Sequence, residues 1–120
     1  MITTETILSN VQAGVPSGNY DGSSQDWYSD AVQAASYYRG RGGLQTLTFR
    51  VQNFVGLIRV EATLDTVAET AHWFRVYDFG DIVNPTTDYH PESILGNFVW
   101  IRLNVLGFDA GTIETVTISY

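Results

Sequence analysis

Apolar and polar side chains alternate with a period of two along several stretches of this chain. The stretches are residues 46–52, 57–64, 74–76, 99–105 and 115–120. In the first of them Leu47, Phe49 and Val51 share one face, and Thr48 and Arg50 share the other. This period is typical of a β-strand with one buried face. Residues 3–11 show a weaker form of the same pattern.

Glycine and polar residues separate these stretches and predict how the strands connect. Residues 53–56 (NFVG) and 108–111 (FDAG) predict two antiparallel hairpins, because glycine adopts a positive φ at little cost. Four further segments lack the strand pattern. We expect a polar loop or arm at 13–30, a segment with some helical propensity and Asp30 as a possible N-cap at 30–38, a helical turn or wide loop at 65–72, and a long loop at 78–96.

Six or more short antiparallel strands in a chain of this length predict an all-β fold. We expect an antiparallel β-sandwich that resembles a jelly roll and has at most one short helix. Residues 1–30 would form an N-terminal arm that contains a first strand and a polar loop, and residues 31–120 the sandwich. The whole chain would fold as a single domain.

The composition excludes several classes of protein. The 120 residues contain no cysteine and no lysine, and 13 acidic residues against six arginines give a net charge of −7. A disulfide scaffold and a thiolate zinc site need cysteine, whereas a Schiff-base enzyme and a Walker-type phosphate loop need lysine. The negative charge disfavours nucleic acid as a partner. We expect no membrane span and, from an N-terminus without signal-peptide features, folding in the host cytosol.

The residues that most often carry catalysis or bind metal form no recognisable set. His72 and His90 are the only histidines, and a surface or loop-anchoring role fits each better than catalysis. Carboxylates could act in a glycosidase or hold calcium, but their spacing matches neither chemistry. The carboxylates considered were Asp78, Asp81, Asp88 and Glu92 for the glycosidase, and Asp21, Asp26 and Asp30 for calcium. We therefore predict a protein that is not an enzyme and needs no metal or cofactor.

A tract rich in tyrosine, arginine and glycine at residues 37–43 stands apart from the rest of the chain. It could contact a neighbouring subunit, because tyrosine and arginine are enriched at interface hot spots. It could equally be a glycine-rich turn whose arginines pair with the chain's own acids. Stacking on single-stranded nucleic acid is less favoured by the net charge. The residues that we predict to contact other subunits are Trp27, Tyr28, Tyr37, Tyr38, Arg39 and Arg41.

Aromatic residues outside the core pattern offer a second kind of surface. Trp73, Tyr89 and Trp100 could stack on the apolar faces of sugar rings, because tryptophan and tyrosine combine a flat apolar surface with a polar group. Packing in the core and against loops explains the same residues more simply. We keep host glycans as an alternative ligand at these three positions.

The motifs of residues 37–118 resemble small virion structural proteins of tailed bacteriophages, especially those of marine cyanobacterial phages. The motifs are residues 37–44 (YYRGRGGL), 53–58 (NFVGLI), 62–66 (ATLDT), 72–74 (HWF), 96–102 (GNFVWIR) and 111–118 (GTIETVTI). They also resemble strands of galactose-binding-like jelly rolls. These are motifs of strands and turns, and none is catalytic. The first third of the chain matches no such pattern.

The phage resemblance implies a non-enzymatic component of the virion. Capsid decoration is the first expectation, and a tail, neck or baseplate accessory is the alternative. The partners would be capsid or tail subunits, with self-association into a homo-oligomer. Residues 1–30 and the 37–43 tract would provide the contacts, and arms of this composition often become ordered only on binding.

Overall fold

The computed structural model describes residues 4–35 and 43–120, and nearly all of its regular structure is β-strand. The strands are β1 (Thr4–Gln12), β2 (Trp27–Tyr28), β3 (Val32–Gln33), β4 (Leu44–Thr63), β5 (Phe74–Leu95) and β6 (Trp100–Ser119). One 3₁₀ turn, η1 (Ala68–Thr70), precedes β5. The all-β expectation is confirmed, and so is the alternative of a short helical turn within residues 65–72.

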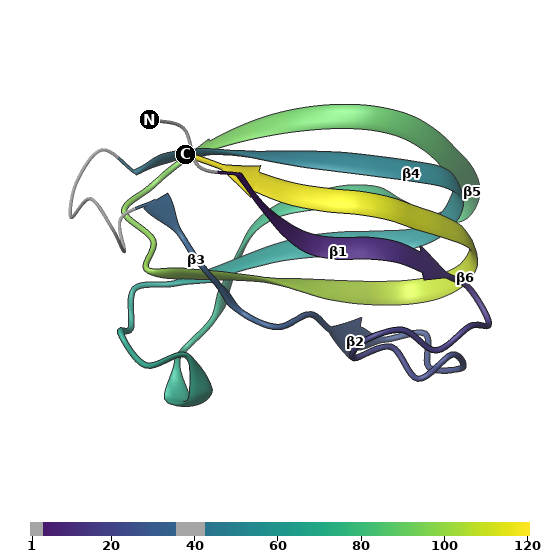
Figure 1. Ribbon diagram of the computed structural model, residues 1–120, viewed down its shortest axis with the longest axis horizontal. Coiled ribbons are helices and arrows are strands. Elements are labelled where there is room, and N and C mark those ends of the chain that lie inside the picture. The colour runs from purple at the N-terminus through teal and green to yellow at the C-terminus, as the bar shows by residue number, and fades with distance from the viewer. Residues whose placement is uncertain (1–3, 36–42) are drawn as a thin grey trace.

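Hydrogen bonds join the strands into one antiparallel sheet in the order β1-β6-β4-β5, and β2 and β3 also pair with β6. The three longest strands bend near their middles, at the end of the molecule opposite the start of β1 and the C-terminus (Figure 1). The sheet therefore folds over on itself, and its two halves pack face to face around one hydrophobic core.

Each half of the folded sheet contains one part of every long strand. The first half-sheet has the order β1, residues 112–119, residues 44–51 and residues 86–95. The second half-sheet has β2 and β3, then residues 100–106, residues 56–63 and residues 74–81. Because β2 and β3 follow one another along the same side of β6, each layer has four strand positions. This arrangement is that of a jelly roll, so the expected jelly-roll-like sandwich is confirmed.

The two predicted hairpins are wrong, because each turn sequence lies inside a single bent strand. Residues 53–56 bend β4, and residues 108–111 bend β6. Asn53 has a φ of 51° and Gly111 a φ of 86°, so both adopt the backbone that a tight turn would need. Here that backbone forms irregularities in the strand pairing, which turn the strand without reversing it. Asparagine and glycine suit both a tight turn and a bend within a strand, so the local sequence did not distinguish a hairpin from a bent strand.

The bend also shifts which side chains face the core. Odd-numbered residues of β4, such as Leu47 and Phe49, are fully buried before the bend, and even-numbered ones, such as Ile58 and Val60, are fully buried after it. The predicted faces of β4 are thus correct on both sides of the bend as far as Ala62. Leu64 was expected to continue the second face, but it lies beyond the end of β4 and is exposed.

The long loop expected at residues 78–96 is also wrong, because β5 continues through most of it to Leu95. This strand pairs with β4 alone, so it forms the edge of both half-sheets. Proline is tolerated on an edge strand because the missing N–H faces away from the partner. Pro85 and Pro91 therefore interrupt the strand signal in the sequence without interrupting the strand.

The polar segment 13–30 packs on the sandwich and contributes two aromatic side chains to its core. Tyr20 and Trp27 are nearly fully buried, and their ring centroids lie 5.3 Å apart. Both rings also contact Phe108, which in turn packs against Phe54 at the bend of β4.

The helix considered for residues 30–38 is not formed at Val32–Gln33, because these two residues are β3. Residues 36–38 lie outside the described residues. Within the described ranges no helix is long and apolar enough to cross a membrane.

Candidate functional site

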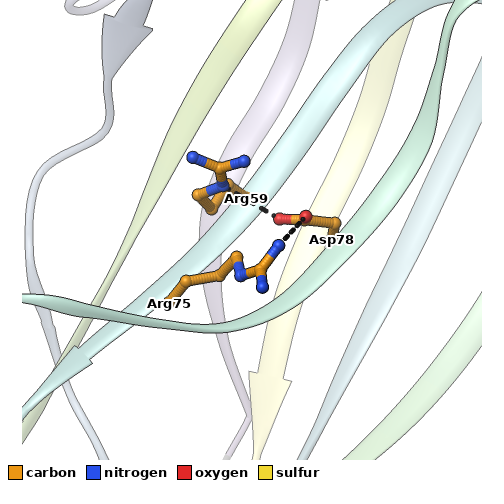
Figure 2. A network of polar contacts seen from close by, with 3 residues as sticks. All are labelled: Arg59, Arg75 and Asp78. Carbon is orange, nitrogen blue, oxygen red and sulfur yellow. Dashed lines mark hydrogen bonds and ion pairs between the residues drawn. The ribbon is translucent and has the colours of Figure 1, made fainter.

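The outer face of the second half-sheet carries paired charges. Arg59 and Asp78 lie directly opposite each other on β4 and β5 and are joined by an ion pair of 3.1 Å. Figure 2 shows Arg75 reaching the same carboxylate, at 3.0 Å. Next to this network, Arg102 on β6 pairs with Glu61 on β4 at 2.8 Å. Alternate residues of a strand share a face, so Trp100 and Arg102 lie on this same side.

An open pocket of about 500 Å³ lies at one end of this face. Its floor is formed by Trp100 and Arg102, and Trp73 from the segment before β5 lines it as well. The segment between β2 and β3 forms one wall and η1 forms another. The residues that these walls contribute are Ser29, Asp30, Ala31, Ala68 and Glu69.

Arg102 is held in place by three neighbours. Its Nε donates a 2.8 Å hydrogen bond to Oε1 of Glu61. The guanidinium carbon lies 4.2 Å from the ring centroid of Tyr28 and 4.4 Å from that of Trp73. Cation–π contacts of this kind are worth about 0.5–2 kcal/mol, more when water is excluded. These three contacts fix the plane of the guanidinium.

The walls of the pocket are also anchored to the sheet. Ser29 is buried, and its backbone N–H donates to the Leu103 carbonyl at 2.8 Å, while its Oγ accepts from the Leu103 N–H at 2.8 Å. On the other side, Nε1 of Trp100 donates a 3.0 Å hydrogen bond to the Thr66 carbonyl. This bond fixes the indole against the loop that leads to η1. The pocket is thus built from side chains whose positions are set by the fold.

The pocket combines flat aromatic surface with hydrogen-bonding groups and carries more negative than positive charge. Asp30 and Glu69 line it together with Arg102, whose guanidinium is paired with Glu61. A volume of about 300–1,000 Å³ with a few polar groups is typical of small-molecule sites. Chemically, the arrangement can bind a ligand that has an apolar face and uncharged polar edges.

The structure brings together two of the three candidate glycan contacts. Trp73 and Trp100 line the same pocket, whereas Tyr89 lies on the first half-sheet beside Arg50, 68 % exposed. The residues that sequence reasoning did not connect with this pocket were Arg102 and the carboxylates of its walls. The alternation of β6 placed Arg102 on the face of Trp100, which was the signal available.

The structure describes two of the six predicted subunit contacts, and these two differ in exposure. Trp27 is 6 % exposed, so its ring offers little surface to a partner. Tyr28 is 48 % exposed and is partly occupied by Arg102. The other four residues lie outside the described residues; they are Tyr37, Tyr38, Arg39 and Arg41.

Both histidines pair with carboxylates at the surface or near the sheet edge. The His72 side chain is 98 % exposed, and its Nδ1 lies 3.2 Å from Asp65. The His72 backbone N–H donates to the same carboxylate at 2.7 Å and lowers the pKa of Asp65. Nε2 of His90 lies 3.1 Å from Oε1 of Glu92 and 3.2 Å from the Tyr77 hydroxyl. Burial raises the pKa of Tyr77, and the negative charge of Glu92 adds to this effect.

The carboxylates considered for calcium serve separate local contacts. Asp21 accepts hydrogen bonds from the Ser23 and Ser24 backbone N–H groups, at 2.8 and 2.7 Å. Asp26 accepts from Gly107, and Asp30 accepts from the Asn19 side chain. Within the described ranges, no three acidic or histidine side chains converge as metal ligands would.

The carboxylates considered for a glycosidase are also engaged locally. Asp78 binds two arginines, and Asp81 accepts from the backbone of Val83 and Asn84, which lowers the pKa of Asp81. Glu92 pairs with His90, and Asp88 accepts from the Tyr89 N–H. Each of these groups thus contributes to the local structure of β5.

Comparisons with protein-family models, with curated proteins and with solved structures each found no match.

Proposed function

We propose that the protein is a non-enzymatic structural component of a bacteriophage particle, attached to neighbouring subunits through the β5 edge. The geometric support is the distribution of exposed apolar side chains. Among the described residues, ten large apolar side chains are exposed, and five of them lie on β5. They are Phe74, Ile82, Val83, Tyr89 and Leu95.

The position of β5 in the sheet adds to this support. The strand is 22 residues long and pairs with β4 alone, so its other side presents backbone groups that can pair with another chain. Apolar side chains on such an edge are typical of surfaces that another subunit covers. Pro91 interrupts the donors in the 86–95 part of the edge, whereas the 74–81 part contains no proline. We therefore assign the backbone pairing to residues 74–81 and the apolar contact to residues 82–95.

The phage assignment itself rests on the resemblance of residues 37–118 to small virion proteins. Within that class, decoration of the capsid is the first choice, and a tail, neck or baseplate accessory is the alternative. The neighbours would be capsid or tail subunits, and the protein would self-associate as symmetric virion components do. The localisation would be the virion, with synthesis in the host cytoplasm.

Purified particles provide the test, and mass spectrometry of their proteins is the first measurement. The protein should be present in many copies, and its absence would refute the proposal. A second measurement compares Val83→Asp with Val15→Asp, because Val83 lies on β5 and Val15 is an exposed valine outside it. Loss of a central contact of about 2 kcal/mol or more would reduce incorporation by at least about tenfold in Val83→Asp. Equal incorporation of the two variants would exclude the β5 edge as the attachment surface.

A further inference from the structure

The pocket formed by Trp73, Trp100 and Arg102 lies on the outer face of the second half-sheet, and none of its lining residues belongs to β5. We propose that this pocket binds a neutral saccharide. Trp73 and Trp100 would pack against the apolar ring faces, and Arg102 would donate hydrogen bonds to hydroxyl groups. This role would be additional to assembly and does not depend on it.

Two indole rings line the same open pocket. Trp73 comes from the segment before β5 and Trp100 from the start of β6, so only the fold brings them together. Sugar rings expose faces of C–H groups, and flat aromatic surfaces bury such faces while the hydroxyl edges stay in contact with water or polar groups. An open pocket of about 500 Å³ is large enough for one or two sugar rings at the end of a chain.

The polar contacts to a sugar would come from Arg102, whose orientation is fixed by its neighbours. Among the described residues, the guanidinium donates one hydrogen bond, from Nε to Glu61. The rings of Tyr28 and Trp73 lie against it, which leaves its terminal amino groups to a ligand in the pocket. A donor that is already oriented loses little conformational entropy on binding, and this increases affinity. Asp30 and Glu69 supply acceptors on the walls.

The charge balance selects the class of saccharide. Asp30 and Glu69 line the pocket, Glu61 neutralises the one positive charge there by pairing with Arg102, and the whole chain carries a net charge of −7. The two neighbouring arginines, Arg59 and Arg75, are already paired with Asp78. A sugar with a carboxylate would meet repulsion from the walls, and Arg102 is compensated by Glu61. Neutral hexoses therefore fit this pocket better than sialic or uronic acids.

Fluorine NMR on the unmodified sequence provides the first test. The chain contains three tryptophans, so incorporation of 5-fluorotryptophan gives three signals. The titrants are methyl glycosides of glucose, galactose, mannose and N-acetylglucosamine, followed by an array of longer glycans. Methyl uronides serve as matched acidic counterparts, because they differ from the hexosides only in the carboxylate at C6. At least one neutral ligand should shift the signals of Trp73 and Trp100 and leave that of buried Trp27 unchanged, with a dissociation constant on the order of 1 mM for a single sugar.

Variants make the test specific to the pocket. Trp73→Phe and Trp100→Phe assign the signals and preserve an apolar ring, and Trp100→Ala and Arg102→Gln should each weaken binding by about tenfold. Tyr89→Ala is the matched control, because this exposed tyrosine lies on the other half-sheet. Its affinity should remain within about twofold of the original protein.

The outcomes separate this proposal from the proposed role in the particle. Failure of every neutral glycan to shift the two signals overturns the saccharide site. Tighter binding of the uronides overturns the assignment to neutral sugars, and equal loss of binding in Tyr89→Ala and Trp100→Ala overturns the location. None of these results changes whether the protein is found in purified particles.

Discussion

The bends of β4 and β6 contact each other at Gly111, and this contact makes a sharp prediction. Gly111 has a φ of +86°, and a Cβ built on it would overlap the carbonyl group of Asn53 at the bend of β4. Gly14 has the same φ of +86°, but among the described residues nothing lies within 4 Å of its Cβ position. Replacing each glycine by alanine therefore separates the cost of the backbone conformation from the cost of the overlap.

The magnitude follows from these two contributions. A left-handed backbone costs an alanine roughly 1–2 kcal/mol, so Gly14→Ala should reduce the free energy of unfolding by about this amount. In Gly111→Ala the overlap is with backbone atoms, which cannot rotate away, so both bends must shift. Overpacking of this kind typically costs about 1–3 kcal/mol. The total for Gly111→Ala is therefore about 2–5 kcal/mol.

Urea denaturation followed by tryptophan fluorescence measures both variants. Trp27 reports on the bends, because its ring packs against Phe108, which contacts Phe54. The midpoint should fall further in Gly111→Ala than in Gly14→Ala, with an unchanged slope if the variants differ in stability alone. Equal midpoints for the two variants would refute the close contact of the bends and, with it, the description of residues 108–111 as a bend inside one strand.

Three other predictions concern the core, the pocket and the pH dependence. Phe49→Ala should cost about 3–5 kcal/mol of unfolding free energy, because this ring is fully buried and stacks on Phe79, whereas exposed Tyr89→Ala should stay within about 0.5 kcal/mol in the same urea titration. Arg102→Lys keeps the positive charge but loses the stacking of the guanidinium on two aromatic rings, and should lower the unfolding free energy by about 1–2 kcal/mol. A loss no larger than that of an Arg→Lys substitution at an exposed arginine would contradict the stacking. The Ser24 hydroxyl and nearby backbone N–H groups lower the pKa of Asp21 from 3.8 to about 2, so its contribution to stability is present above pH 3.8 and is lost as the pH falls through 2. Carbon NMR titration should find the Asp21 midpoint near 2, and a midpoint near 3.8 would contradict these hydrogen bonds.

The candidate pocket was only partly accessible to sequence reasoning. The period-two pattern correctly placed Trp100 and Arg102 on the face opposite the core of β6. It could not indicate that Trp73, at the start of another strand, would lie against Arg102, or that Ser29 would anchor a wall of the pocket to Leu103. Those contacts join residues separated by more than 25 positions, and periodicity carries no information at that range.

The sequence by itself determined the strands of the alternating stretches, most of the side chains that these strands turn inward, and the layered all-β class. Such features can be predicted from the alternation of apolar and polar side chains along the chain, which is a local property of the sequence. The tertiary structure decided that residues 53–56 and 108–111 bend a strand rather than reverse it, and that residues 78–95 form an edge strand. An asparagine or glycine at positive φ permits either path, and a proline is acceptable at an edge. The choice therefore belongs to the long-range pairing of β4 with β5 and β6, which buries the core.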